Sequence, residues 1–540
     1  MPAPQNIVPQ KALRPDVQPQ NVLPQDVLPQ NILFVTPEIY PLVKTGGLAD
    51  ISGALPLALR RQGLDVRVLV PGYPPILERL PDAVPLADVS ALARDSGGAR
   101  VLGATMPGTD LPLLILDCPA LYARPGGPYL SPEGRDWEDN VLRFGLLGRV
   151  GALLASADTP LDWKPQVVHC NDWQSGLIPA LLHYSRKPHA RTVMSIHNLM
   201  FQGNFGREWV THVALPPESY GMDGVEFFGH FSFLKAGLYF ADQITTVSRT
   251  YAEEIQTPEF GYGMDGLLKW RRAVLHGIVN GIGDDWHPAT DTYLHTRYDG
   301  TTVRDKAVNK RELQREMKLK IAPDAPLLCL VSRLTRQKGI DLMLDCVPDL
   351  VQAGAQFAIL GSGEAQYEER LKTLAQRYPG QIGVVLGHDE ALAHRLIAGG
   401  DIFLMPSRFE PCGLAQMYAM AYGTPPVARR TGGLADTIVD TNEATLHDGA
   451  ATGFLFDGQS SAALMYAVRR ALKCYRSPDV WRSIQASGMK CDFSWTAAAL
   501  AYIEVYRAAL AQPETAPAPR GSRSAPAAER RPAKPALAKR

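Results

Sequence analysis

The sequence predicts an α/β protein built from two doubly wound, Rossmann-like domains that face each other across a central cleft. Short apolar runs alternate with longer helical patterns, which is typical of βαβ units with a parallel sheet. This rhythm occurs in two series, separated near residues 280–325. The length of 540 residues also exceeds what one hydrophobic core usually accommodates. Such sheets bind ligands at the carboxyl ends of their strands, so we expect the site between the domains.

Each predicted strand is a short, mostly apolar run that ends in turn or polar residues, as buried parallel strands do. The first series lies at residues 32–35, 66–70, 113–116, 166–168 and 193–196. The second series lies at residues 327–331, 357–360, 384–386 and 402–405. We therefore expect the N-terminal domain over residues 31–279 and the C-terminal domain over residues 280–494.

Both ends of the chain have compositions that do not support a folded core. Residues 1–30 repeat a Val/Leu-Pro-Gln theme, and proline at that frequency disfavours helices and central strands. Residues 512–540 are rich in Ala, Pro and Arg and poor in large apolar groups. We expect both segments to be disordered extensions, the second of them basic.

The bulk composition argues against several classes of function. The 55 basic and 55 acidic side chains balance, so no overall charge attracts nucleic acid or a membrane surface. Seven scattered cysteines without a Cys-x-x-Cys spacing argue against a disulfide framework and a zinc site. No apolar run is long enough to cross a bilayer and no secretory pattern opens the chain, so we expect a cytoplasmic protein. The oligomeric state stays open.

The first candidate site residues follow the first predicted strand. Lys44 precedes the paired glycines Gly46 and Gly47, which stand just before a helical stretch. Glycines there let the backbone approach a ligand closely, and amide groups at a helix N-terminus favour a phosphate. The lysine adds a mobile positive charge. Gly-Gly turns are also common without any function, so this motif alone leaves a solvated turn equally open.

A second group of cations follows the first strand of the C-terminal domain. Arg333 and Lys338 stand on the loop that leaves this strand, where a doubly wound sheet binds its ligands. A departing nucleoside diphosphate develops negative charge, and fixed cationic donors stabilise that charge without a metal. We therefore expect neither a metal nor a cofactor here. A surface basic pair without function is the alternative interpretation.

Two further motifs of the C-terminal domain supply a carboxylate and backbone donors. Glu410 follows the strand at residues 402–405, and a carboxylate there accepts hydrogen bonds from sugar hydroxyls. Its alternative role is a charge at a helix N-terminus, worth up to about 1 kcal/mol. Thr431, Gly432 and Gly433 form a second Thr-Gly-Gly loop, which offers amide donors to a phosphate.

Taken in order, these motifs resemble glycosyltransferase family 5, the bacterial glycogen synthases and plant starch synthases. The resemblance covers residues 32–511 and leaves out only the two ends. Any one string could arise by accident, but five in the family's order make a specific signal. The strings are Lys44-Thr45-Gly46-Gly47-Leu48-Ala49-Asp50, Ile196-His197-Asn198, Ser332-Arg333-Leu334 with Gln337-Lys338-Gly339, Glu410-Pro411-Cys412-Gly413-Leu414 and Thr431-Gly432-Gly433-Leu434-Ala435-Asp436.

The resemblance implies a two-domain GT-B enzyme that transfers glucose from ADP-glucose to the free end of an α-1,4-glucan. The family retains the anomeric configuration without a required metal, through same-face attack in which the departing phosphate helps to deprotonate the acceptor hydroxyl. The resemblance also implies that Glu410, His197, Arg333 and Lys338 form the catalytic group. Residues 495–511 look like the family's last helix, which crosses back to the N-terminal domain.

By the same resemblance, both domains contribute to donor binding. The cations bind the phosphates, Glu410 holds the glucosyl unit, and His197 with Asn198 lines the sugar pocket from the opposite wall. A histidine after a buried strand is often only a structural residue, which is the alternative for His197. The expected donor-binding residues are Lys44, Gly46, Gly47, Asn198, Arg333, Lys338, Thr431, Gly432 and Gly433.

The acceptor is expected mainly on the N-terminal side of the cleft. Asp172 and Trp173 match a family stretch that lines the active cleft, and a core position is the alternative for the tryptophan. Tyr122 resembles a residue of a family loop near the acceptor. Asn280, at the start of the C-terminal domain, completes the expected acceptor and cleft set.

The chain departs from the family at several positions. Relatives commonly have histidine at Asn171 and Gln174, and aspartate at Gly283, where this chain also lacks one residue before Trp286. In that loop Asp284 is a candidate replacement for the missing aspartate. These changes leave a catalytically weak glucan-binding relative as an alternative function. Another GT-B transferase using UDP-glucose is the alternative among enzymes, because the residues alone do not identify the donor's base.

Overall fold

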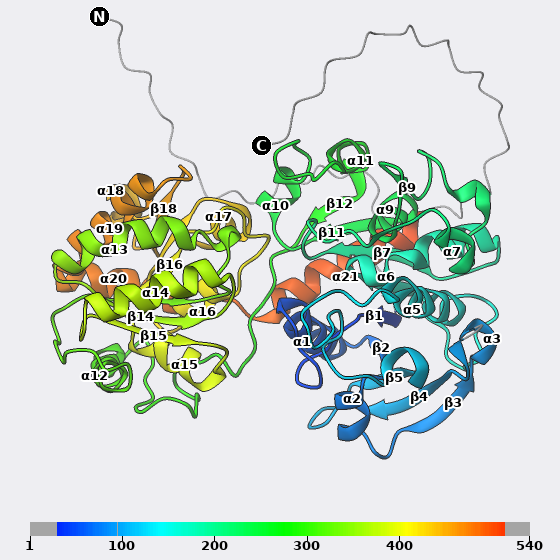
Figure 1. The fold of residues 1–540 in the computed structure, drawn as a ribbon, viewed down its shortest axis with the longest axis horizontal. Coiled ribbons are helices and arrows are strands. Elements are labelled where there is room, and N and C mark those ends of the chain that lie inside the picture. Colours follow the sequence, from blue (N-terminus) through cyan, green and yellow to red (C-terminus); the bar gives the residue numbers. More distant parts are fainter. Residues whose placement is uncertain (1–29, 94–95, 513–540) are drawn as a thin grey trace, which may run out of the picture.

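The computed structural model describes residues 30–93 and 96–512. The two expected extensions, at residues 1–30 and 512–540, therefore lie outside the described residues except for Gln30 and Gln512. The described chain forms two α/β domains, each with a central sheet covered by helices (Figure 1). The predicted α/β class is confirmed.

A largely parallel sheet forms the centre of the N-terminal domain. Its strands are β1 (Asn31–Val35), β2 (Asp65–Pro71), β3 (Val84–Asp88), β4 (Arg100–Thr105), β5 (Pro112–Asp117), β6 (Val167–Asn171), β7 (Arg191–Ile196), β11 (Gln243–Thr246) and β12 (Leu275–Gly277). Their order in the sheet is β12-β11-β7-β6-β1-β2-β5-β4-β3. Neighbours run parallel except at the edge, where β4 is antiparallel to both β5 and β3. The sheet order reverses at β1, so the loop after β1 lies at a switch point where ligands bind.

The sheet of the C-terminal domain is parallel throughout the described residues. Its strands are β13 (Leu327–Val331), β14 (Gln356–Gly361), β15 (Ile382–Leu386), β16 (Ile402–Met405), β17 (Pro426–Arg429) and β18 (Phe454–Phe456). The order β15-β14-β13-β16-β17-β18 reverses between β13 and β16. The loops after these two strands therefore open next to each other at the carboxyl edge.

Helices follow most strands and cover the sheets. In the N-terminal domain they are α1 (Gly47–Arg61), α2 (Pro74–Arg79), α3 (Ser90–Ala93), α4 (Pro119–Tyr122), α5 (Asn140–Leu154), α6 (Asp172–Ser175), α7 (Leu177–Ser185), α8 (Trp209–His212), α9 (Phe233–Phe240), α10 (Arg249–Glu254) and α11 (Asp265–Trp270). From residue 306 on they are α12 (Lys306–Glu316), α13 (Ile340–Gln352), α14 (Ala365–Arg377), α15 (Glu390–Gly399), α16 (Ala415–Ala421), α17 (Gly432–Thr437), α18 (Glu443–His447), α19 (Ser461–Tyr475), α20 (Pro478–Met489) and α21 (Trp495–Ala511).

Several short elements complete the fold. The 3-10 turns are η2 (Pro217–Ser219), η3 (Arg272–Val274), η4 (Val303–Asp305) and η5 (Arg336–Lys338). A small antiparallel sheet of the N-terminal domain has the order β8-β10-β9, with β8 (Asn204–Phe205), β9 (Glu226–Phe227) and β10 (His230–Ser232). This sheet follows the loop that leaves β7, so it lies on the ligand-binding side of the domain.

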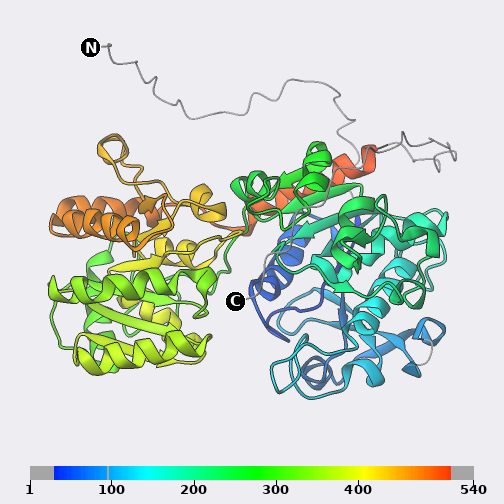
Figure 2. The ribbon, with the colours of Figure 1, turned by 45° about the horizontal axis from the view of Figure 1, so that its top comes forward.

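The last helix, α21, leaves the C-terminal domain and packs against the N-terminal one (Figures 1 and 2). It contacts α1, β6, β7 and β11. The Tyr506 hydroxyl lies 2.8 Å from His169 Nδ1, and the other ring nitrogen of His169 lies 2.6 Å from Ser195 Oγ. The two segments that connect the domains also touch, because Ile282 N donates to Phe493 O at 2.8 Å.

The described residues were also searched for membrane-spanning helices and for disulfide bonds. None of their helices combines the length and apolar character needed to span a membrane. All seven cysteines lie in the described part and carry free thiols, five of them buried.

Candidate active site between the two domains

The loop after β1 presents the first glycine motif at the start of α1. Gly46 and Gly47 are exposed, and a methyl group placed on Gly46 would meet no atom within 4 Å, so the space beside this backbone is open. Lys44 Nζ lies 2.8 Å from Asp50 Oδ1 in the first turn of the helix. Burial alone would lower the pKa of Lys44, but the Asp50 carboxylate outweighs this and raises it. The lysine therefore stays charged.

Glu38, which the sequence did not single out, holds the backbone of this loop by a hydrogen bond. Its carboxylate accepts a hydrogen bond from Thr45 N, and only 3% of the residue is exposed. Burial raises the pKa of Glu38 to about 7, against the hydrogen bonds that lower it. The carboxylate thus fixes the backbone one residue before Gly46.

In the C-terminal domain, Lys338 and Glu410 form an ion pair between the loops after β13 and β16. Lys338 Nζ lies 2.6 Å from Glu410 Oε2, and the Ser407 hydroxyl donates to the same oxygen at 2.9 Å. Gly339 permits this approach: its φ of 66° is left-handed, and a Cβ there would lie 2.0 Å from Pro406 O. Glu410 is 6% exposed. The structure thus joins the expected phosphate-binding lysine and the expected sugar-binding carboxylate into one unit.

Arg333 stands beside this pair on the same loop but is arranged differently. The residue is exposed, and its guanidinium makes no hydrogen bond or ion pair with any residue that the structure describes. A guanidinium offers several donors in a planar fork that matches phosphate oxygens. Arg333 is therefore a cation whose donors are open to a ligand.

The two domains meet directly at these loops. The Cβ position of Gly47 lies 3.9 Å from Leu414 Cδ1, in the string that begins at Glu410. Ser248, which precedes α10 in the N-terminal domain, donates through its hydroxyl to Pro411 O at 2.6 Å. The first glycine motif and the Glu410 loop therefore face each other across the domain boundary.

The second glycine motif is not open to a phosphate in this structure. Glu254 of the N-terminal domain accepts hydrogen bonds from Thr431 Oγ1 at 2.8 Å and from Gly432 N at 3.0 Å. Gly433 N donates to the carbonyl of Glu410. A Cβ on either glycine would lie 2.0 Å from a carbonyl oxygen of the Glu410 loop. These glycines are needed here because two loops pack closely, and their expected donor-binding role stays a prediction.

A second carboxylate makes the reverse contact across the same boundary. Asp436, at the end of α17, accepts from Arg249 N at 2.6 Å, from Thr250 N at 3.0 Å and from Thr250 Oγ1 at 2.6 Å. The first amides of a helix lack partners within it, so each domain caps a helix of the other. Figure 1 shows α10 and α17 side by side between the domains. Sequence reasoning missed Glu254, because no local pattern marks a cap that comes from another domain.

His197 lies at the end of β7 as a neutral hydrogen-bond acceptor. Its Nε2 lies 3.0 Å from Asn171 Oδ1, which can only accept, so Nε2 carries the proton. Nδ1 is then an acceptor, and it is buried without a partner among the described residues. Burial lowers the pKa of His197 to about 3, so the ring stays neutral. Asn198 follows, with its Oδ1 accepting from Met200 N at 3.1 Å.

Asp172 positions His197. Its Oδ1 accepts from His197 N at 2.8 Å, the residue is 8% exposed, and its φ of 55° is left-handed. Burial raises the pKa of Asp172 to about 7. The carboxylate thus anchors the backbone that carries the histidine ring.

Two expected acceptor residues, Tyr122 and Trp173, make packing contacts within the N-terminal domain. Tyr122 is 1% exposed, and its hydroxyl donates to Arg143 O at 2.7 Å. Trp173 packs edge-on against Phe144 at 5.0 Å between ring centroids and near Phe205 and Phe233. For the tryptophan, the alternative core position fits. Tyr122 is buried and Trp173 is partly buried, and the acceptor roles of both stay predictions.

The altered loop at the start of the C-terminal domain is held by stacking. Trp286 lies between His394 and Tyr418, with ring centroids at 3.6 and 3.9 Å. Asp284 points outward with 91% of its side chain exposed, 3.9 Å from Arg61, so it does not replace the missing aspartate at the site. Asp285 instead lies within electrostatic range of Lys44.

Asn280 lies at the Glu410 loop. It is 4% exposed and donates hydrogen bonds to the thiol of Cys412. Its Oδ1 is buried without a partner among the described residues. Asn280 therefore ties the start of the C-terminal domain to the site.

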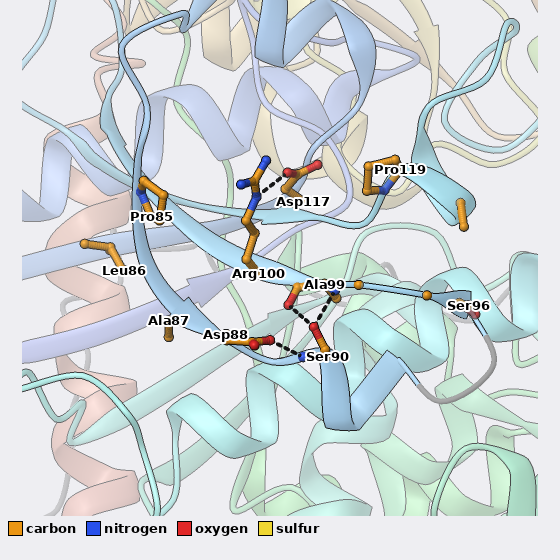
Figure 3. A pocket seen from close by; sticks show the side chains of 13 residues that line it. Pro85, Leu86, Ala87, Asp88, Ser90, Ser96, Ala99, Arg100, Asp117 and Pro119 are labelled. Atoms are coloured by element: carbon orange, nitrogen blue, oxygen red, sulfur yellow. Dashed lines mark hydrogen bonds and ion pairs between the residues drawn. The ribbon is translucent and has the colours of Figure 1, made fainter.

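A hollow of about 770 Å³ lies elsewhere, between β3, β4 and the start of α4 (Figure 3). Arg100 Nε donates to Asp117 Oδ2 at 2.9 Å on its wall, and the Ser90 hydroxyl lies 3.2 Å from Ala99 O. None of the expected site residues lines it. The first glycine motif and the Glu410 loop lie at the domain boundary, and none of the expected residues lies in this hollow.

Comparison with known proteins identifies the family. A model described as "Starch synthase catalytic domain" matches residues 31–270, and one described as "Glycosyl transferases group 1" matches residues 312–486. The chain is 50% identical to a glycogen synthase of Nitrosospira multiformis over 483 residues, covering 89% of this chain and 97% of the relative. It is 51% identical to a glycogen synthase of Dechloromonas aromatica over 480 residues, covering 89% and 98%.

A solved structure agrees with these matches. The catalytic domain of starch synthase IV from Arabidopsis thaliana, bound to ADP and acarbose, superposes with a TM-score of 0.79 at 28% identity. The match covers 90% of this chain and 100% of that one. The predicted pair of facing domains, the GT-B architecture, is therefore confirmed. With relatives half identical over nearly their full length, the chain belongs to the glycogen synthase family of glycosyltransferases.

Proposed function

We propose that this enzyme transfers glucose from ADP-glucose to the non-reducing end of an α-1,4-glucan, with retention of configuration and release of ADP. One observation carries the proposal: the loop of Glu410, which is paired with Lys338, meets the exposed Gly46–Gly47 backbone across the domain boundary. A diphosphate that spans this boundary would meet cations on one side and free backbone on the other.

The charges suit the departure of a diphosphate. As the bond between the sugar C1 and the phosphate oxygen breaks, negative charge grows on that oxygen. Lys338 is held by Glu410 and Arg333 has open donors, so both would stabilise this charge, and removal of one such donor typically costs about 10²–10³ in rate. Lys44 adds a third cation from the N-terminal domain. We propose that these side chains supply the positive charge and that no metal or cofactor is required.

The sugar would lie between Glu410 and His197. Glu410 accepts hydrogen bonds from the sugar hydroxyls while it stays paired with Lys338. His197 Nδ1 is a buried acceptor without a partner in the described structure, so a sugar hydroxyl would satisfy it. In this scheme the ring binds and orients the sugar, and its low pKa keeps it from acting as an acid.

The acceptor hydroxyl would attack on the face that the phosphate leaves. The new bond forms between C1 and the acceptor oxygen, the bond from C1 to the phosphate oxygen breaks, and the acceptor proton passes to the departing phosphate. Such a reaction needs positioning and charge stabilisation more than a protein nucleophile. The buried Asp172, held by His197 N, fits a positioning role. The seven free thiols fit the reducing, cytoplasmic location that the sequence predicts.

The test is the incorporation of labelled glucose into glycogen, with ADP-glucose and UDP-glucose supplied in parallel. We expect incorporation from ADP-glucose, a strong loss in a Lys338→Met variant, and normal rates in Lys372→Ala, whose ammonium pairs with Glu369 on α14. Faster transfer from UDP-glucose would overturn the choice of donor. Incorporation at background level from both donors would favour a non-catalytic glucan-binding protein.

A further inference from the structure

Two exposed aromatic side chains lie at the edge of the N-terminal domain beside the site. Phe228 is 76% exposed and Tyr262 is 39% exposed. The ring centroid of Tyr262 lies 6.1 Å from that of Phe409, the residue before Glu410. We call Phe228 and Tyr262 the aromatic rim. Large exposed aromatic groups beside a binding site indicate a surface that a ligand covers.

Phe228 occupies a position where its residue type is disfavoured. The register pairs Phe227 with His230, so Phe228 and Gly229 form a two-residue hairpin loop between β9 and β10. Their φ values, 48° and 82°, are both left-handed. Asn-Gly and Asp-Gly are the preferred pairs in such a loop, because a bulky side chain crowds the left-handed backbone. A phenylalanine that is unfavourable here and also exposed indicates a function for its ring.

Tyr262 repeats this arrangement in a second turn. Tyr262 and Gly263 have φ values of 48° and 84°, again both left-handed. The two turns pack together, since a Cβ on Gly263 would lie 2.8 Å from Phe228 Cε2. Strained conformations persist only where the surroundings hold them, and here both display an aromatic ring.

Hydrogen bonds fix both turns to the rest of the site. Gly229 N donates to Glu226 Oε1 at 2.7 Å, and the Tyr220 hydroxyl donates to Gly229 O at 2.9 Å. Gln202 Nε2 donates to Tyr262 O at 3.1 Å. Gln202 belongs to the loop that leaves β7 and carries His197 and Asn198. The aromatic rim is therefore anchored to the His197 loop and reaches toward Glu410.

We propose that the aromatic rim binds the acceptor α-1,4-glucan chain, at glucose units beyond the one that receives the new sugar. Glucose rings present apolar C–H faces, which pack on exposed aromatic rings while their hydroxyls stay solvated. The rim lies next to Glu410 and His197, so a chain on it would extend from the reacting end. This inference rests on the proposed glucan transfer and deepens it by naming residues for the acceptor.

The variant Phe228→Asn tests this without weakening the turn. Asparagine is favoured at this position, so the midpoint of thermal unfolding should stay the same or rise. Loss of the ring should raise both the Kd and the KM for maltoheptaose by about tenfold, which corresponds to the loss of one aromatic contact. The kcat and the KM for ADP-glucose should change much less. Tyr262→Asn, also in a left-handed turn, should act in the same direction.

A matched control comes from the C-terminal domain. Tyr466 on α19 is 66% exposed and belongs to no element of the site, so Tyr466→Asn should leave maltoheptaose binding and turnover unchanged. An unchanged Kd for maltoheptaose in folded Phe228→Asn and Tyr262→Asn would overturn the aromatic rim, as would an equal loss in Tyr466→Asn. Binding of maltoheptaose is measured by calorimetry without ADP-glucose, so it tests the aromatic rim independently of glucose transfer. A wild-type protein that transfers no glucose would overturn the proposed function, but not the binding role of the rim.

Discussion

Replacing Lys338 with methionine tests the charge arrangement of the proposed site. The ammonium lies 2.6 Å from Glu410 Oε2, and 19% of the lysine and 8% of the glutamate side chain are exposed. Methionine keeps much of the volume of the stem but removes the charge. The nearly buried Glu410 carboxylate then keeps only the hydrogen bond from the Ser407 hydroxyl among its described side-chain contacts.

Two separate losses follow from this geometry. Breaking a buried ion pair from one side costs about 3–5 kcal/mol, and the partial exposure of Lys338 reduces our expectation to about 2–3 kcal/mol of unfolding free energy. Losing a fixed donor at a developing charge costs about 10²–10³ in kcat/KM. The variant should therefore be both less stable and nearly inactive.

The double variant Lys338→Met with Glu410→Gln separates these losses. It removes both charges, so much of the stability should return, while activity stays lost because neither the cation nor the carboxylate is present. Urea unfolding gives the free energies, and labelled glucose incorporation gives kcat/KM. A Lys338→Met variant within threefold of wild-type kcat/KM would refute the proposed role of this charge, and so would a double variant that recovers activity together with stability.

Two further perturbations address the domain boundary and the loop after β1. Asp436→Ala removes the cap that the C-terminal domain places on α10. It should lower the free energy of unfolding in urea by about 1–2 kcal/mol and increase the hydrolysis of ADP-glucose without acceptor. Asp448→Ala, at an exposed position, is the control, and equal behaviour of the two variants would contradict the capping role. Burial raises the pKa of Glu38 from its ordinary 4.5 to about 7. The contribution of Glu38 to the free energy of unfolding is therefore fully present below pH 4.5 and is lost as the pH rises through 7. Glu38→Gln should therefore gain about 3 kcal/mol relative to wild type between pH 4.5 and 8, while parallel stability–pH profiles would exclude a raised pKa.

The sequence predicted the parts of the fold that local patterns encode. The strands β1, β13 and β16 are mainly apolar runs, and the motifs of Lys44, Arg333 and Glu410 follow them. The antiparallel edge of β3 and β4 was missed, because β3 has mostly exposed residues and therefore no buried run. Strand direction at an edge depends on connections that periodicity does not reveal.

The missed features of the site depend on contacts between distant residues. Glu254 and Gly432 are 178 residues apart in the chain, and no motif indicates that a carboxylate of one domain occupies the glycine loop of the other. The Tyr122 hydroxyl donates to Arg143 O and Trp173 packs against Phe144, and no local pattern marks either contact with α5. Side-chain direction, unlike strand position, is decided by tertiary packing.

The return of α21 to the N-terminal domain has a consequence for synthesis on the ribosome. Tyr506 completes the polar cluster of His169 and Ser195 between β6 and β7, and it is translated after the whole C-terminal sheet. The surfaces of α1, β6, β7 and β11 that α21 contacts therefore stay uncovered while the second domain is translated. The N-terminal domain completes its packing only after residues 495–511 leave the exit tunnel, and until then this uncovered surface favours aggregation of the nascent chain.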